Sequence, residues 1–238
     1  MLQNSRNKKM KALAIDSSSN CITFTVRNED KTVRLALDIG MHQSEQLLPS
    51  IEHVLTLASL SASDLEFTAL CEGPGSFTGL RLSYAALKAL QLANETPIYA
   101  VPTLEALAYP FAQWKGAVVP VIDAKKNRFY AAVYRNGKEN TPAADATIET
   151  IASWLDKEEE ILAAGPDAEY FAECLIAACP ELKVTTLRSF YIDAGQQLLE
   201  IANKMYLEKK APMQDYDGPV YIRPSEAEEK RAAERDPE

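Results

Sequence analysis

The chain has only two histidines in 238 residues, His42 and His53, and they form neither an H-x-x-x-H nor an H-E-x-x-H pair. Its four cysteines include no C-x-x-C pair. A zinc site needs several such ligands at a defined spacing, so the sequence predicts no metal site. Ser-His-Asp hydrolysis also has little support, because the choice of general base is small and no G-x-S-x-G motif occurs.

Long apolar runs are absent as well. None approaches the roughly 18 residues that a membrane-spanning helix requires. The basic N-terminal residues lead into a strand-like pattern rather than into the apolar region of a signal peptide. The formal net charge of −9 repels nucleic-acid phosphates. We therefore expect a cytoplasmic protein with reduced cysteines, no membrane partner and no strong RNA binding by this chain alone.

Strand-like and helix-like segments alternate along the chain in two similar series. Strands are expected at 11–17, 21–28, 31–37, 67–73, 97–101, 117–123, 128–136, 161–164 and 183–187. Helices are expected at 44–59, 80–94, 103–112, 147–155, 168–178 and 194–209. Ser44 is the expected N-cap of the first helix, and Pro49 predicts a bend or a later start there. The charged residues after 223 predict a solvated tail.

An I-D-x-x-x-N pattern occurs twice, from Ile15 to Asn20 and from Ile122 to Asn127. Each copy ends one predicted strand and leads into the next. The similarity is either a coincidence or the trace of a duplicated lobe. Duplication predicts an α/β, actin-like (ASKHA, ribonuclease H-like) fold of two lobes, each with a mixed sheet flanked by helices. The expected lobes are 10–112 and 113–222, followed by a charged tail at 223–238.

The two hairpins of that fold class clamp a nucleotide in its ATPase members, which carry Asp-x-Gly at each turn. Here Ser18 and Lys125 stand where those glycines would let the backbone approach a phosphate, so an ordinary ATPase clamp is not expected. Asp16 and Asp123 remain at the two turns. They either face each other across an interlobe cleft as an acid–base pair or fix their own hairpins.

The stretch CEGPGSFTGLR contains three of the nine glycines and lies between a predicted strand and a predicted helix. Backbone N–H groups at a helix start attract anions, but the stretch lacks the Gly-Lys-Ser/Thr end of a Walker A loop. A helix terminus contributes about 0.3–1 kcal/mol, whereas millimolar affinity needs about 4 kcal/mol. The stretch therefore holds an anion or nucleotide weakly at most, or it is a turn in which Pro74 fixes the chain and Ser76 or Thr78 caps the helix. The candidate contacts are Gly73, Gly75, Ser76, Thr78, Gly79 and Arg81.

The two first-lobe helices are apolar on more than one side, which indicates burial against several neighbours. Either they are wholly internal, or a partner covers one side. For the second interpretation the interface candidates are Leu47, Leu48, Ile51, Leu55, Ser83, Ala86, Leu87 and Leu90.

The stretch GPGSFTGLR, between its strand and its Ala/Leu-rich helix, resembles the signature of the TsaB (YeaZ) family of tRNA threonylcarbamoyladenosine (t6A) biosynthesis proteins, once classed with glycoproteases. Further segments that carry the resemblance are AIDSSS, HQSEQLLPSIEHVL, VPTLEALA, VIDAKKNRFYAAVY and PVYIRP. The resemblance extends from about Met10 to Pro224 and is loose after about Asn140.

The resemblance implies a non-catalytic scaffold subunit that pairs with the paralogous TsaD, which threonylcarbamoylates adenosine 37 of ANN-decoding tRNAs. It also implies association with the TsaE ATPase through the complex, a homodimer when the partner is absent, and only indirect contact with tRNA. No cofactor is expected to bind firmly, and a weak ATP or ADP contact at the partner joint stays open. The alternatives are an M22-type glycoprotein peptidase and a sugar-kinase-like phosphotransferase.

Overall fold

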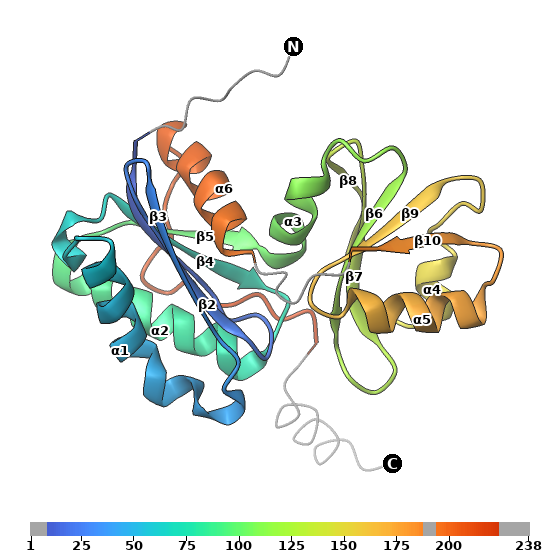
Figure 1. Cartoon of the computed structure of the whole chain (residues 1–238), viewed down its shortest axis with the longest axis horizontal. Helices are drawn as coiled ribbons and strands as arrows, with labels where there is room; N and C mark the ends of the chain where they lie inside the picture. Colours follow the sequence, from blue (N-terminus) through green and yellow to red (C-terminus); the bar gives the residue numbers. More distant parts are fainter. Residues whose placement is uncertain (1–8, 188–193, 224–238) are drawn as a thin grey trace.

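The structure is a computed structural model that describes residues 9–187 and 194–223. Within these residues the chain forms two lobes, each built on a five-stranded sheet (Figure 1). The first sheet has the order β3-β2-β1-β4-β5 and the second the order β10-β9-β6-β7-β8. The charged tail predicted after residue 223 lies outside the described residues.

The elements of the first half are β1 (Lys11–Asp16), β2 (Ile22–Asn28), β3 (Lys31–Leu37), α1 (Gln43–Leu57), β4 (Phe67–Gly73), α2 (Phe77–Asn94), β5 (Ile98–Pro102) and α3 (Thr103–Ala108), with short 3-10 turns η1 (Gly40–His42), η2 (Ala62–Asp64) and η3 (Tyr109–Phe111). Those of the second half are β6 (Ala117–Asp123), β7 (Phe129–Arg135), β8 (Lys138–Ala146), α4 (Ile148–Ala152), β9 (Glu160–Ala164), α5 (Ala168–Ala178), β10 (Lys183–Thr186) and α6 (Gly195–Leu207).

The two sheets repeat one arrangement. Strand β1 pairs antiparallel with β2 and parallel with β4, and β6 pairs antiparallel with β7 and parallel with β9. The two I-D-x-x-x-N patterns fall on the corresponding turns, after Asp16 and after Asp123. This confirms the actin-like duplicated fold and places the two patterns at equivalent turns of the two lobes.

Helices cover both faces of the first sheet. Helices α1 and α2 enclose one apolar cluster around Phe24, Leu70 and Leu87, and α6 packs against β1, β4 and β5 on the opposite face. In the second lobe α5 covers one face of the sheet, while α3 contacts β6 and β7 from the other and also contacts β4, β5 and α6. Helix α3 therefore lies between the lobes, within a core cluster to which both contribute (Figure 1).

The position of α6 corrects the expected lobe boundary. The sequence places residues 194–209 in a second lobe ending at 222, but α6 packs against β1, β2, β4 and β5 of the first-lobe sheet. The second lobe is thus a contiguous unit that ends before α6, and the first lobe is completed by the C-terminal part of the chain.

Strand β8 was not predicted. Its sequence KENTPAADA contains Pro142 and has no apolar alternation. The reason is its place at the edge of the sheet, where most of its residues contact solvent and a proline costs no ladder hydrogen bond.

The expected N-cap of α1 was also wrong. The helix begins at Gln43, so Ser44 is already inside it, and the cap position is His42, whose side chain forms no capping bond. Pro49 lies within the helix, which excludes a later start at this residue and leaves the bend as a prediction.

Candidate functional site

The glycine-rich loop from Gly73 to Gly79 is packed against the β1–β2 turn. The Ser76 N–H donates to the Ser18 carbonyl at 2.7 Å. A Cβ at Gly75 would lie 2.7 Å from the same oxygen, and a Cβ at Gly79 would overlap the Ser17 carbonyl oxygen. The glycines at these two positions are thus explained by the approach of the hairpin backbone.

The same loop starts α2. The Ser76 hydroxyl accepts from the Gly79 N–H at 3.2 Å and is the N-cap, whereas Thr78 is exposed in the first turn. The Gly73 N–H donates to the Thr103 hydroxyl at 3.2 Å. Of the two interpretations of the loop, these contacts favour the turn that caps a helix.

Asp16 is buried and its carboxylate is fully engaged. Oδ1 accepts from the Ser18 N–H at 3.0 Å, the Ser18 hydroxyl at 2.6 Å and the Cys71 thiol at 3.2 Å. Oδ2 accepts from the Ala194 N–H at 2.9 Å. The side chain thus joins β1, its turn, β4 and the start of α6. It is not among the residues that line the cavity, so these contacts favour the interpretation in which Asp16 fixes its own hairpin.

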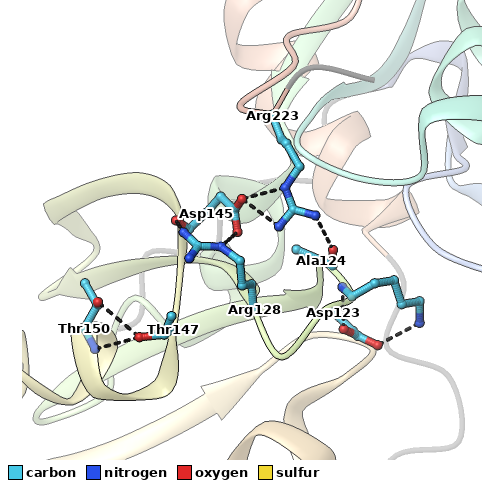
Figure 2. Close-up of polar contacts among 8 residues, drawn as sticks. Asp123, Ala124, Arg128, Asp145, Thr147, Thr150 and Arg223 are labelled. Carbon is cyan, nitrogen blue, oxygen red and sulfur yellow. Dashed lines mark hydrogen bonds and ion pairs between the residues drawn. The ribbon is translucent and has the colours of Figure 1, made fainter. Parts of the chain in front are cut away.

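Asp123 occupies the corresponding turn of the second lobe and does line the cleft. Its carboxylate accepts from the Lys125 N–H at 2.7 Å and pairs with the Lys125 ammonium at 2.7 Å (Figure 2). The hydrogen bond to Asp123 raises the pKa of Lys125. The Asp123 N–H donates to Asp167 at 2.8 Å, and burial, reinforced by the Asp123 charge, raises the pKa of Asp167.

A cavity of about 430 Å³ is lined by residues of both lobes. The β1–β2 turn, the glycine-rich loop and the β6–β7 turn all contribute to its wall, which includes Ser19, Gly75 and Lys125. The volume lies within the usual range of small-molecule pockets. Its charged lining is mixed, with Asp38, Asp123 and Asp167 against Lys125 and Arg223. Such a lining does not select an anion.

Residues 213–223, which we call the C-terminal segment, reach one side of this cavity with their last four residues. Its Val220, Tyr221, Ile222 and Arg223 line the cavity. Arg81, expected at an anion, instead places its guanidinium 3.9 Å from the centre of the Phe77 ring and donates to the Tyr221 hydroxyl at 3.0 Å. The motif PVYIRP was the only sequence signal for this segment, and its contacts were not predicted.

The second-lobe contacts of this segment were also not predicted. Arg223 donates to Asp145 at 2.7 Å and to the Ala124 carbonyl at 2.8 Å, and Arg128 donates to the same carboxylate at 2.8 Å (Figure 2). Asp145 lies on β8, the strand that the sequence did not reveal, so no local pattern could have indicated this cluster.

The structure divides the predicted interface residues into buried and exposed ones. Leu48 is 63% exposed, and Leu90 is half-buried. The others are buried in the first lobe itself and support α1 and α2 from within: Leu47, Ile51, Leu55, Ser83, Ala86 and Leu87. The exposed face of α2 is formed by other residues, Thr78, Arg81, Ala85, Ala89 and Leu92. We call these five residues the α2 outer face.

Among residues 9–187 and 194–223, no three His, Cys, Asp or Glu side chains gather as metal ligands. Within the same ranges, no helix is both long and apolar enough to span a membrane. Both histidines lie on the exposed surface of the first lobe, where His42 is next to Glu45, and neither lines the cavity.

Two corresponding sheets, paired hairpin turns and an interlobe cavity define an actin-like two-lobe protein. The family model described as "TsaD: tRNA N6-adenosine threonylcarbamoyltransferase" matches residues 39–231. The chain belongs to this family, and within it to the TsaB (YeaZ) proteins.

Among its relatives, the Bacillus subtilis "tRNA threonylcarbamoyladenosine biosynthesis protein TsaB" is 26% identical over 93% of this chain and 97% of its own. The Escherichia coli protein of that name is 27% identical over 90% of this chain and 95% of its own. A solved structure from Pseudomonas aeruginosa, described as uncharacterized with similarity to peptidase YEAZ, matches with a TM-score of 0.75. It is 22% identical and covers 90% of this chain and all of its own, so it supports the fold alone.

Proposed function

We propose that this chain is a non-catalytic subunit of the machinery that makes t6A in tRNA, and that it acts by binding a TsaD paralog. The relatives named as t6A biosynthesis proteins support the pathway, since the match extends over nearly the whole of both chains. The match to the TsaD model supports a partner of related fold.

The observation that carries the binding role is the α2 outer face. Leu92 on this face is 84% exposed, and Ala89 and Ala85 lie on the same side of the helix one and two turns earlier. Leu48 and Leu57 on the neighbouring α1 are exposed as well, but they lie on opposite flanks of that helix. Small side chains allow another helix to approach closely, and exposed leucine next to them favours burial by a partner.

The cleft supports an accessory role rather than catalysis. Asp16 is surrounded by donors, the glycines of the loop are explained by the hairpin, and Arg81 is engaged by Phe77 and Tyr221. The hairpin glycines that ATPases of this fold class use are thus replaced, and the carboxylate of Asp16 is occupied by hydrogen bonds within the first lobe and to α6. The proposal assigns the transfer of the threonylcarbamoyl group to the partner.

The test is co-purification with the TsaD paralog from the same genome, combined with mass-spectrometric measurement of t6A in tRNA incubated with and without this chain. Ala89→Glu places a charge at the centre of the α2 outer face. We expect it to weaken the complex by at least about 30-fold, because a charge buried without a partner costs about 2–5 kcal/mol.

The matched control is Ala177→Glu, the same change on the exposed side of α5 in the second lobe. Both variants should keep the wild-type circular dichroism spectrum, and Ala177→Glu should keep its binding. If Ala89→Glu binds as tightly as Ala177→Glu, the α2 outer face is not the interface. If t6A forms equally well without this chain, the accessory role itself is wrong.

A further inference from the structure

The lobes are connected on two sides of the cavity. On one side α3 joins them through a shared apolar core that includes Leu104, Val118 and Ile122. On the other side lies the C-terminal segment, which passes between the lobes after leaving the first one (Figure 1). The first connection consists of packed apolar side chains, whereas the second consists only of the C-terminal segment.

The C-terminal segment is fixed to the first lobe at several points. The Met213 N–H donates to the Ile98 carbonyl at 2.9 Å, and the Val220 N–H donates to the Glu72 carbonyl at 2.9 Å. The Lys88 ammonium donates to the Gln214 carbonyl, and the Tyr221 ring lies 4.8 Å from that of Phe77, centre to centre. Up to residue 222, the described contacts of the segment therefore hold it on the first lobe.

Arg223 then crosses to the second lobe. Its guanidinium pairs with Asp145 on β8 and donates to the carbonyl of Ala124 in the β6–β7 turn (Figure 2). The side chains of Arg223 and Asp145 are only 17% and 13% exposed. Such a pair is screened less than a surface ion pair, and breaking it leaves a partly buried charge without its partner.

We propose that the C-terminal segment is a strap that holds the two lobes in one relative orientation, with Arg223 as its latch on Asp145. When the latch is released, the lobes pivot about the α3 core and the cavity between them opens. The cavity wall contributed by Val220 and Tyr221 stays with the first lobe in this motion. This device goes beyond the binding role proposed above and does not depend on it.

The chain carries its own reporter of the motion. Cys21 lines the cavity, Cys71 is fully buried in the first lobe, and Cys174 lies on α5 outside the cavity. The experiment is pulse labelling with N-ethylmaleimide, with the rate at each cysteine followed by mass spectrometry of peptides. When a cysteine is labelled only in the open form of the cavity, the labelling rate is proportional to the population of that form.

Arg223→Ala should raise the labelling rate of Cys21 by about tenfold, which corresponds to about 1.4 kcal/mol of opening free energy. The rate at Cys174 should stay at its wild-type value, and Cys71 should stay protected, which shows that the variant is folded. Arg223→Lys, which keeps the charge but loses the two-pronged contact, should fall between wild type and Arg223→Ala.

The matched control is Arg128→Ala. Arg128 donates to the same Asp145 carboxylate, at 2.8 Å, but its backbone belongs to the second lobe. The substitution Arg128→Ala removes one arginine partner of Asp145, as Arg223→Ala does, but it cuts no connection between the lobes. The labelling rate of Cys21 should therefore not rise. The proposal is overturned if Arg223→Ala leaves the Cys21 rate unchanged in a folded protein, or if Arg128→Ala raises it equally.

Discussion

The substitution Gly79→Ala tests whether the glycine-rich loop is shaped by the hairpin or by a ligand. Gly79 lies in the first turn of α2 with an ordinary helical backbone, so alanine alone would favour the helix by about 1 kcal/mol. The new Cβ, however, would lie well inside 3.0 Å of the Ser17 carbonyl oxygen, which is backbone and cannot rotate away.

The cost of this overlap can be estimated from two terms. Inserting a methyl group into a packed site costs about 1–3 kcal/mol. The shift also strains the bond in which the Ser17 hydroxyl donates to the Gly79 carbonyl at 2.8 Å, and a hydrogen bond of this kind is worth about 1 kcal/mol. After subtracting the gain in helix propensity, we expect Gly79→Ala to lower the free energy of unfolding by about 1–3 kcal/mol.

Urea denaturation followed by circular dichroism measures this change. Thr78→Ala is the control, because Thr78 is exposed in the same turn and should stay within about 0.5 kcal/mol of wild type. A Gly79→Ala protein as stable as wild type would refute the reasoning, because the hairpin would then leave room for a side chain and the glycine would need another explanation.

Two further predictions concern the core and the cleft. Leu87 is fully buried between α2 and the first sheet, so Leu87→Ala should lower the free energy of unfolding by about 2–5 kcal/mol; a change below 1 kcal/mol in urea denaturation would mean that this side chain is not part of the core. The raised pKa of Asp167 means that its ionised form is disfavoured in the folded protein, so its carboxyl destabilises the fold as the pH rises through that pKa. Relative to wild type, Asp167→Asn should therefore have a higher free energy of unfolding at pH 7 than at pH 3.5. An equal effect of the substitution at both pH values would contradict this sign.

The fold could be predicted from the sequence because its elements are strongly patterned. The predicted strands at 31–37, 67–73 and 117–123 and the helix at 168–178 match β3, β4, β6 and α5 residue for residue. The repeated I-D-x-x-x-N pattern predicted the duplication because it marks the same turn in each lobe. Strand β8 gave no such signal, since an edge strand in solvent is free of the alternation that burial imposes.

The site was harder to predict because its contacts join distant parts of the chain. Asp16 meets Ala194 and Arg223 meets Asp145, and no local spacing encodes either pair. The apolar pattern of α1 and α2 indicated burial on more than one side, but it did not separate the residues facing the sheet from those facing outward. For that reason the buried Leu87 was among the interface candidates, whereas the exposed Ala85 and Ala89 were not.

The bond from the Ala194 N–H to Asp16 has a consequence for how the protein is made. The second lobe is one uninterrupted stretch of chain, but the first lobe needs residues from both ends of the sequence. During synthesis the second lobe can therefore complete its fold before α6 has been made. At that stage one face of the first sheet, around Phe67 and Ala14, is not yet covered. A ribosome that pauses before residue 194 would hold a nascent chain with that face uncovered, and this is the stage at which the protein most needs protection from aggregation.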